Sequence, residues 1–386
     1  MRTGFPLATE GSNSAHMSSP VFIGSRIYRG SVYGPRHPLS IQRVPAVTDL
    51  ARALGWVPDN RYRPSPRAKP VALTGFHTPA YINALQAAEA AQQVSDEVRA
   101  RHGLGTLSNP VFPEMYRRPA TAVGGGLLAA ELVRDGGIVH NPGGGQHHGL
   151  PDAAAGFCFL NEPVLTIRRL LDMGLQRVAY VDIDAHHCDG VELAFEGSQR
   201  VRMISIHEAR RWPFTGALED RAGGSAFNLP VARGFNDTEF KMVLEEMILP
   251  AVETFRPEAI FLQCGADALA EDPLARLSLS NRSHVTTVRA LRPLAPRMIV
   301  SGGGGYNPWT VARCWTAVWG EIAGKQVPER LPQEAEAVLR ALVWHRKGQP
   351  EEALFTTLLD SPREGAISGD LRADVARLQA RLAPAL

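Results

Sequence analysis

The sequence has no long hydrophobic run and very little cysteine. No apolar stretch reaches the roughly 18 residues of a membrane-spanning helix, and the N-terminus lacks the basic and apolar regions of a secretory signal. Only four of the 386 residues are cysteines, and they are scattered along the chain as Cys158, Cys188, Cys264 and Cys314. This usage is typical of reduced thiols in a cytoplasmic protein and does not indicate a disulfide framework.

The chain also lacks an excess of either charge. It contains 41 Lys and Arg against 39 Asp and Glu, which gives a formal net charge of +2. Such a balance gives no reason to expect nucleic acid or a membrane surface as the partner. Apolar residues make up 44% of the chain, which is enough for a large core.

The pattern of strands and helices predicts one α/β domain. Residues 1–20 are small and polar without periodicity, and are predicted to be a disordered leader, with Met17 as an alternative start. Residues 21–386 are expected to form the folded domain. Strands and helices alternate over 138–324, which predicts a mainly parallel sheet in a single three-layer α/β/α domain. Residues 325–386 are expected to form a C-terminal helical extension.

The central stretch of the chain is RVAYVDIDAHHCDG, residues 177–190. Its apolar start, Val178 to Val181, predicts a buried parallel strand. Asp182, Asp184 and His186 follow at alternate positions, so an extended backbone places them on one face. Because unpaired buried charge costs several kcal/mol, and because ligands bind beyond the carboxyl ends of parallel strands, this cluster indicates a bound cation.

Polar groups also follow three other predicted strands, and we expect all four clusters to meet at one edge of the sheet. Asp184, His186 and Asp267 would provide three ligands and leave one position open, which is the pattern of a catalytic Zn²⁺ site. Such an ion polarises a carbonyl and acidifies a water molecule. A neutral histidine, an orienting carboxylate and a hydroxyl donor would complete the chemistry. The candidates for these three roles are His147 and His148, Asp182 and Asp189, and Tyr306.

Four segments, in order, resemble the signature motifs of the histone deacetylase family. They read PGGGQHHG…GFCFLN, VDIDAHHCDG, QCGAD and SGGGGYN, and four motifs in register are far more specific than one. The family includes bacterial histone deacetylase-like amidohydrolases, acetylpolyamine amidohydrolases and acetoin utilisation proteins. The resemblance covers roughly residues 20–325 and implies an arginase–deacetylase type of fold. It also implies zinc-dependent removal of acetyl or other acyl groups from acyl-lysine side chains, polyamines or small amines.

The resemblance also implies roles for individual residues. Asp184, His186 and Asp267 match the zinc ligands, and Tyr306 matches the carbonyl-polarising tyrosine. His148 matches the general base and His147 its electrostatic or acidic partner, with Asp189 and Asp182 as their respective carboxylates.

Further implied roles concern the substrate and structural ions. Gly156, Phe157 and Trp212 match the walls of the acyl-lysine tunnel, and Arg43 matches an arginine of the internal cavity that holds released acetate. Potassium would bind through carbonyls near Asp182, Asp184, His186, Ser205 and Ile206, with a second ion near Phe195, Ser198 and Val201.

The chain departs from the family pattern at three places. Cys188 stands where glycine is usual, so its turn must avoid left-handed torsion angles or be strained to reach them. Its thiol invites a redox role or is a buried apolar filler. The loop GTLSNPVFP lacks the Tyr-Asp pair that holds a substrate backbone, and Ser108 is a weaker acceptor. Trp212 replaces the more common phenylalanine, which narrows the tunnel.

Two alternative functions remain open at this point. One is a non-catalytic binder of acyl-lysine, and the other is a dimanganese hydrolase of the arginase type. Taken alone, Asp267 would more often be a helix N-cap and Tyr306 a core residue. The substrate is not decided, because acidic residues at the entrance would suit polyamines, and Glu219, Asp220 and Glu114 are candidates. The long loops are compatible with a homo-oligomer.

Overall fold

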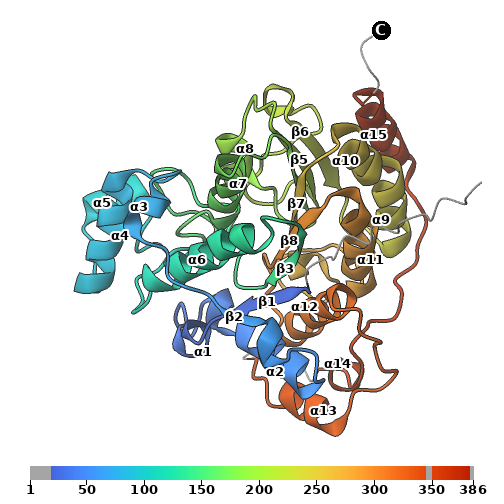
Figure 1. Ribbon diagram of the computed structural model, residues 1–386, viewed down its shortest axis with the longest axis horizontal. Helices are drawn as coiled ribbons and strands as arrows, with labels where there is room; N and C mark the ends of the chain where they lie inside the picture. The colour runs from blue at the N-terminus through green and yellow to red at the C-terminus, as the bar shows by residue number, and fades with distance from the viewer. Residues whose placement is uncertain (1–18, 345–349, 383–386) are drawn as a thin grey trace, which may run out of the picture.

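The computed structural model describes residues 19–344 and 350–382, so most of the predicted leader lies outside the described residues. These ranges fold around one eight-stranded sheet with the order β2-β1-β3-β8-β7-β4-β5-β6, in which all neighbours run parallel (Figure 1). The parallel sheet was predicted. The strands are β1 Val21–Gly24, β2 Tyr62–Pro64, β3 Gly137–Asn141, β4 Val178–Asp182, β5 Val201–Glu208, β6 Ala226–Val231, β7 Ala259–Gln263 and β8 Arg297–Ser301.

Helices precede, connect and follow these strands. In the first half of the chain they are α1 Ile27–Gly30, α2 Val44–Ala53, α3 Pro70–Leu73, α4 Pro79–Ala91, α5 Asp96–His102, α6 Arg117–Leu132, α7 Glu162–Asp172 and α8 Asp189–Ala194. In the second half they are α9 Asp237–Val243, α10 Leu249–Phe255, α11 Asn281–Leu291, α12 Pro308–Ile322, α13 Gln333–Arg340, α14 Ala353–Thr356 and α15 Gly369–Ala380.

The side chains of β4 show why the fold has three layers. Val178 and Tyr180 pack into a buried cluster with apolar residues of α6, α7 and α8. Ala179 and Val181 point to the opposite face and pack with α2, α11 and α12. Alternate residues of a strand face opposite sides, and Figure 1 shows the two groups of helices on either side of the sheet. The predicted three-layer α/β/α arrangement is confirmed.

The order of the strands places the four polar clusters together. Strands β3, β8, β7 and β4 are neighbours in the middle of the sheet, and their carboxyl ends lie on the same edge. The loops that follow them carry His147, Tyr306, Asp267 and Asp184. The expectation that these groups share one edge is therefore confirmed.

The helical spacing of residues 78–101 predicts a single helix, but two helices occupy this range. Thr78 caps α4 as expected, accepting a hydrogen bond from the Tyr81 amide. The chain then turns at Gln92, whose φ of +53° ends the helix. Ser95 starts α5 by accepting from the Val98 amide, so a second N-cap signal lay inside the predicted helix.

Three other predicted boundaries differ from the structure. The region 208–230, predicted as a loop, ends in the edge strand β6, where Pro230 is tolerated because edge strands need fewer backbone donors. Helix α6 begins at Arg117, four residues before the predicted start at Thr121. The helix predicted over 237–255 contains a π-helical turn at Leu244–Ile248 between α9 and α10.

The C-terminal segment is only partly helical in its described residues. Helices α13, α14 and α15 are separated by irregular chain. The segment buries Leu339 and Val375 from these helices, and Leu358 from the chain between them, in the same core that covers the sheet. None of the helices in the described ranges is long and apolar enough to cross a membrane.

Candidate metal centre and active site

The three predicted metal ligands lie together at the carboxyl edge of the sheet. Nδ1 of His186 is 2.9 Å from an oxygen of Asp267 and 3.3 Å from an oxygen of Asp184. One ligand atom from each of the three residues lies within 4.8 Å of the others. Two carboxylate oxygens and one imidazole nitrogen are a donor set that suits Zn²⁺ and leaves a coordination position open. The residues therefore fit the metal that the sequence predicts.

Backbone amides orient both carboxylates. Asp184 accepts from the amides of His186 and Gly304, at 3.0 and 2.6 Å, and Asp267 accepts from the Ala185 amide at 3.0 Å. A side chain at Gly304 would overlap Asp267, so the glycine-rich loop can approach this closely only because it lacks a Cβ atom. The ligands are thus held in place by the loops that follow β4, β7 and β8.

The protonation behaviour of these residues shows that the site collects positive charge. Burial alone would lower the pKa of His186, but its hydrogen bonds with Asp184 and Asp267 raise that pKa to about 10. Burial would likewise raise the pKa of Asp184, but the neighbouring His147 and His186 bring it well below its usual value. Burial and the charge of Asp184 raise the pKa of Asp267. Two adjacent buried carboxylates need a cation between them.

The tandem histidines stand beside the ligands, each held by its own carboxylate. Nδ1 of His147 is 2.8 Å from Asp182, and Nδ1 of His148 is 2.7 Å from Asp189. The other ring nitrogen of each histidine, Nε2, is left free of these carboxylates, and that of His147 is 3.8 Å from Asp184. The two pairings predicted from the sequence occur in the structure.

The two histidines differ in their electrostatic surroundings. Burial lowers the pKa of His148 to about 4, and the charge of His147 acts in the same direction. For His147, burial is outweighed by Asp182 and Asp184, which raise its pKa to about 9. The surroundings therefore favour the charged form of the first histidine and the neutral form of the second. Two titratable groups with separated pKa values are typical of an acid–base pair.

Tyr306 lies on the other side of the metal centre. Its amide donates to the buried carboxylate of Asp272 at 2.7 Å, which positions its backbone. Burial and the nearby carboxylates of Asp267 and Asp184 keep the pKa of its hydroxyl well above the usual value. The side chain is therefore a neutral hydrogen-bond donor, as an oxyanion site requires.

The predicted tunnel walls flank this arrangement. The rings of Phe157 and Tyr306 meet edge to face, with their centroids 5.7 Å apart. The rings of Trp212 and His148 have centroids 4.6 Å apart. Gly156 and Phe157 form a tight turn in which both have positive φ, at +51° and +68°. A bulky residue in this conformation is uncommon and costs energy, so the turn holds Phe157 in a position it would not otherwise favour.

A small internal cavity lies behind the metal centre. It has a volume of about 50 Å³, and its lining includes the tandem histidines, Asp184 and Tyr306. Arg43 reaches it from the start of α2 and donates to the carbonyl of Gly303. The structure thus places Arg43 at the same cavity as the proposed metal ligand Asp184.

Several residues that support the site were not predicted. Asn161 donates to the carbonyls of His147 and Gly149, and the buried carboxylate of Glu162 accepts from the Gly145 amide. Asn161 and Glu162 begin α7, so this helix end holds the loop that carries the histidines. Asn161 is the last residue of the GFCFLN motif and could have been noticed there. The groups that Asn161 and Glu162 bind lie 12 to 17 residues away in the chain, so their contacts could not be predicted.

Cys188, which stands where the family usually has glycine, adopts an ordinary backbone conformation. Its φ of −82° lies outside the left-handed region, as the loss of the usual glycine requires. The side chain is fully buried, and burial raises the pKa of its thiol well above the usual value. A buried, protonated thiol is a poor nucleophile, so the geometry favours the interpretation as an apolar filler.

Two of the three acidic residues considered as entrance guards have other contacts, and the role of Glu114 stays a prediction. Glu219 pairs with Arg377 of α15 at 2.5 Å, and Asp220 accepts from the Ala217 amide. Exposed apolar side chains lie in the loops that carry Trp212 and Ser108: Phe214 is 74% exposed and Leu107 is 97% exposed. The loop of Leu107 reaches the tunnel through Ser108, whose carbonyl contacts His37, and His37 packs against Phe157.

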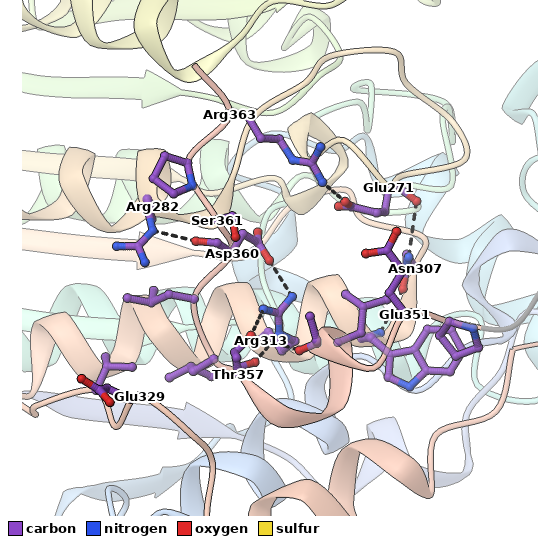
Figure 2. Close-up of a pocket in the computed structure, with 18 of the residues that line it drawn as sticks. Glu271, Arg282, Asn307, Arg313, Glu329, Glu351, Thr357, Asp360, Ser361 and Arg363 are labelled. Atoms are coloured by element: carbon purple, nitrogen blue, oxygen red, sulfur yellow. Dashed lines mark hydrogen bonds and ion pairs between the residues drawn. The ribbon is translucent and has the colours of Figure 1, made fainter. Parts of the chain in front are cut away.

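A larger cavity of about 840 Å³ lies between the C-terminal segment and α12 (Figure 2). Its charged side chains are largely paired with one another: Arg313 binds Asp360 and Thr357, and Arg363 binds Glu271. It adjoins the catalytic edge through Asn307, which follows Tyr306, and through Glu271, whose carbonyl accepts from Asn307. None of the proposed metal ligands lines it.

The fold and the site together define a class of protein. A single parallel sheet places three metal ligands, two carboxylate-held histidines and a tyrosine at one edge, which is the arrangement of a metal-dependent hydrolase.

Comparison with known proteins identifies the family. The model of the histone deacetylase domain matches residues 37–322, and the chain belongs to this family. "Histone deacetylase 9" of Arabidopsis thaliana is 36% identical over 315 residues, covering 79% of this chain and 73% of the relative. "Acetoin utilization protein AcuC" of Bacillus subtilis is 34% identical over 332 residues, covering 82% of this chain and 86% of the relative.

A solved structure of an HDAC homologue from Aquifex aeolicus has a TM-score of 0.89 and 33% identity, covering 94% of this chain and all of that one. An HDAC homologue complexed with SAHA gives the same values. The chain is thus a hydrolase of the deacetylase family, with the arginase–deacetylase type of fold. Zinc dependence is a general property of this family.

Proposed function

We propose that the protein removes acetyl groups from lysine side chains, with one Zn²⁺ held by Asp184, His186 and Asp267. The observation that carries the proposal is the pair of histidine–carboxylate contacts beside this ligand set, at 2.8 and 2.7 Å. When bound, the zinc supplies a Lewis acid that polarises the amide carbonyl and lowers the pKa of water.

The histidines divide the proton transfers between them. His148 faces the tunnel wall Trp212, and its Nδ1 is held by Asp189, so Nε2 accepts the proton of the attacking water. His147, whose Nδ1 is held by Asp182, remains protonated beside Asp184 and stabilises the negative charge that develops. The pair then delivers a proton to the leaving amine nitrogen.

Tyr306 and the tunnel residues provide binding and orientation. The tyrosine hydroxyl donates to the carbonyl oxygen as it becomes negative. Phe157 and Trp212 pack against the apolar lysine stem and exclude water from the reacting amide. Arg43 lines the internal cavity, where it can bind the carboxylate of the released acetate.

For the substrate class, we propose acetyl-lysine in a peptide or protein in preference to a polyamine. The exposed residues near the tunnel include Leu107, Trp212 and Phe214, which suit an apolar contact with a peptide. A polyamine would need carboxylates at the entrance, whereas Glu219 is paired with Arg377.

The test is a side-by-side assay of an acetyl-lysine peptide and acetylspermidine. We expect kcat/KM for the peptide to be at least tenfold higher, and the ratio to be unchanged in Glu219→Gln. A preference for acetylspermidine that is lost in Glu219→Gln would contradict the substrate proposal. Hydrolysis of neither substrate, with a hydroxamate still bound, would instead favour the non-catalytic binder.

The remaining predictions concern ions, assembly and location. Metal analysis distinguishes one zinc from the two manganese ions of an arginase-type hydrolase. In the described residues one group of three such ligands is found, which supports the single ion. Potassium near the carbonyls of Asp182 and Ser205, a homo-oligomer and a cytoplasmic location stay predictions.

A further inference from the structure

The internal cavity lies on the acyl side of the proposed substrate. The amine part enters between Phe157 and Trp212; Phe157 also lines the cavity, whereas Trp212 does not. His147, Asp184 and Tyr306 line the cavity at the metal centre, and the rest of its lining extends to Tyr28, Tyr33 and Leu39. Because the amine is on the tunnel side of the carbonyl, whatever the acyl group carries beyond that carbonyl must point into this cavity.

Two arginines line this cavity, and neither has a carboxylate partner among the described residues. Arg43 donates to the Gly303 carbonyl and lies 4.9 Å over the ring of Trp315. Arg118, from the first turn of α6, donates to the Ser31 carbonyl and lies over the rings of Tyr28 and Tyr33. Both guanidinium groups are thus held by carbonyls and rings, which orient a positive charge but do not neutralise it.

The remaining polar atoms of this region are also incompletely paired. Nε of Arg43, Oε1 of Gln146 and Oγ of Ser31 are buried without a hydrogen-bond partner. Among the described residues that line the cavity, the only carboxylate is Asp184, which the metal would neutralise. Burial lowers the pKa of Arg43, and the charge of Arg118 adds to this effect. Buried charges are normally paired, so an anion bound in this cavity would be stabilised.

An acetyl group carries no charge, so the guanidinium groups of Arg43 and Arg118 keep no carboxylate partner among the described residues while it is bound. We propose that the cavity selects acyl groups that end in a carboxylate, and that Arg118 is the residue that determines this specificity. This inference rests on the proposed amide hydrolysis. A water-sized group needs about 10–15 Å³ of such space, so about 50 Å³ has room for roughly three to five heavy atoms. Compared with an acetyl group, a malonyl group has three more heavy atoms and a succinyl group has four more.

The chemistry of the reaction is unchanged by this selection. The oxygen of water bonds to the acyl carbon, the C–N bond breaks, and the amine nitrogen takes the proton. The products are the free lysine side chain and malonate or succinate. A planar guanidinium group binds a carboxylate through two parallel hydrogen bonds. A neutral acyl group of the same shape would leave both arginines unpaired, so the site should discriminate against it.

The test compares peptides that differ only in the acyl group on one lysine: acetyl, malonyl, succinyl and isovaleryl, the last being a neutral analogue with the shape of malonyl. For the zinc-loaded protein we expect kcat/KM for malonyl or succinyl to exceed that for isovaleryl at least tenfold. In Arg118→Gln this ratio should fall at least tenfold, and Arg118→Lys should give an intermediate value. Arg117→Gln removes the neighbouring charge, which is exposed and paired with Glu89, and should keep the wild-type ratio.

A binding measurement keeps the inference independent of turnover. Calorimetry on the metal-free protein should show malonate binding that weakens at least tenfold in Arg118→Gln and not in Arg117→Gln. Hydrolysis of acetyl-lysine with no preference for malonyl or succinyl over isovaleryl would overturn the inference and leave the proposed function standing. Failure to hydrolyse any peptide would overturn the proposed function, while malonate binding would still decide whether the cavity takes a dicarboxylate.

Discussion

At the scale of single residues, the site depends on carboxylates that hold other side chains. Asp182 and Asp189 fix the ring nitrogens of the tandem histidines, and Asp272 fixes the backbone of Tyr306. Each contact places a reactive group within reach of the same point, where a charge develops during amide hydrolysis. Removing one such group should therefore affect turnover far more than folding.

Tyr306→Phe tests the oxyanion role directly. The change removes only the hydroxyl, so the buried ring can still pack against Phe157. Loss of one oxyanion donor typically lowers kcat about 100-fold or more, and we expect this loss with little change in thermal stability. Deacetylation kinetics and thermal unfolding measure the two effects, and wild-type turnover in this variant would reject the assigned role.

Glu162 gives a prediction on pH dependence. Burial raises its pKa from 4.5 to about 7, although the Gly145 amide and the side chains of Thr166 and Ser301 favour the charged form. Because the folded protein binds this proton more tightly than the unfolded chain, the contribution of Glu162 to stability is present below pH 4.5 and is lost as pH rises through 7. The loss amounts to roughly 3 kcal/mol at most, at 1.36 kcal/mol per pKa unit.

The matched variant is Glu162→Gln, which cannot ionise. Urea unfolding of both proteins between pH 5 and pH 8 should show the variant gaining stability relative to the wild type as pH rises. A constant difference across this range would mean that Glu162 does not titrate in it.

Some of these residues could be predicted from the sequence and others could not. The ligands and histidines follow strands and occur in short motifs, so spacing alone was sufficient to propose Asp184 and His186 as ligands. Arg118 was missed because the sequence placed it in a loop, whereas α6 already begins at Arg117 and turns the side chain inward. Asp272 was missed because its partner, the Tyr306 amide, is 34 residues away.

At the scale of elements, helix ends and loops position the site more than helix interiors do. The start of α7 holds the histidine loop through Asn161 and Glu162, and the start of α12 follows directly on Tyr306. The long apolar strands and capped helices were predictable, because their periodicity is local. The edge strands β2 and β6 were not, since each is short or contains proline, and pairing with β1 or β5 is what makes them strands.

Arg313 in α12 ties the C-terminal segment to the body of the protein. It is almost fully buried and binds Asp360 and Thr357, as the dashed lines in Figure 2 mark. Arg313→Met should lower the free energy of unfolding by about 3–5 kcal/mol, because it leaves Asp360 buried without its partner. Urea unfolding provides the measurement.

The control is Arg289→Met, which breaks an exposed ion pair with Glu321. Exposed pairs contribute about 1 kcal/mol or less, so this variant should be close to wild type. Equal effects of the two substitutions would show that the buried contacts of Arg313 do not stabilise the C-terminal segment.

At the scale of the whole molecule, the sheet order creates the site. Strands β3, β8, β7 and β4 are far apart in sequence but adjacent in space, and their loops converge on one edge (Figure 1). Helices cover both faces of the sheet. Polar side chains can therefore gather in the loops at this edge, where the strands end. The parallel sheet and its catalytic edge were predictable from the alternation of strands and helices, whereas the exact order of strands required the structure.

The central claim is that one divalent ion, held by Asp184, His186 and Asp267, is needed for deacetylation. The most direct measurement is to strip the protein with a chelator and follow acetyl-lysine hydrolysis as Zn²⁺ is added back. We predict no activity without metal, a linear rise and a plateau at one zinc per chain, with Asp267→Asn requiring a much higher zinc concentration. Full activity in the stripped protein, or a plateau reached only at two ions per chain, would contradict the account.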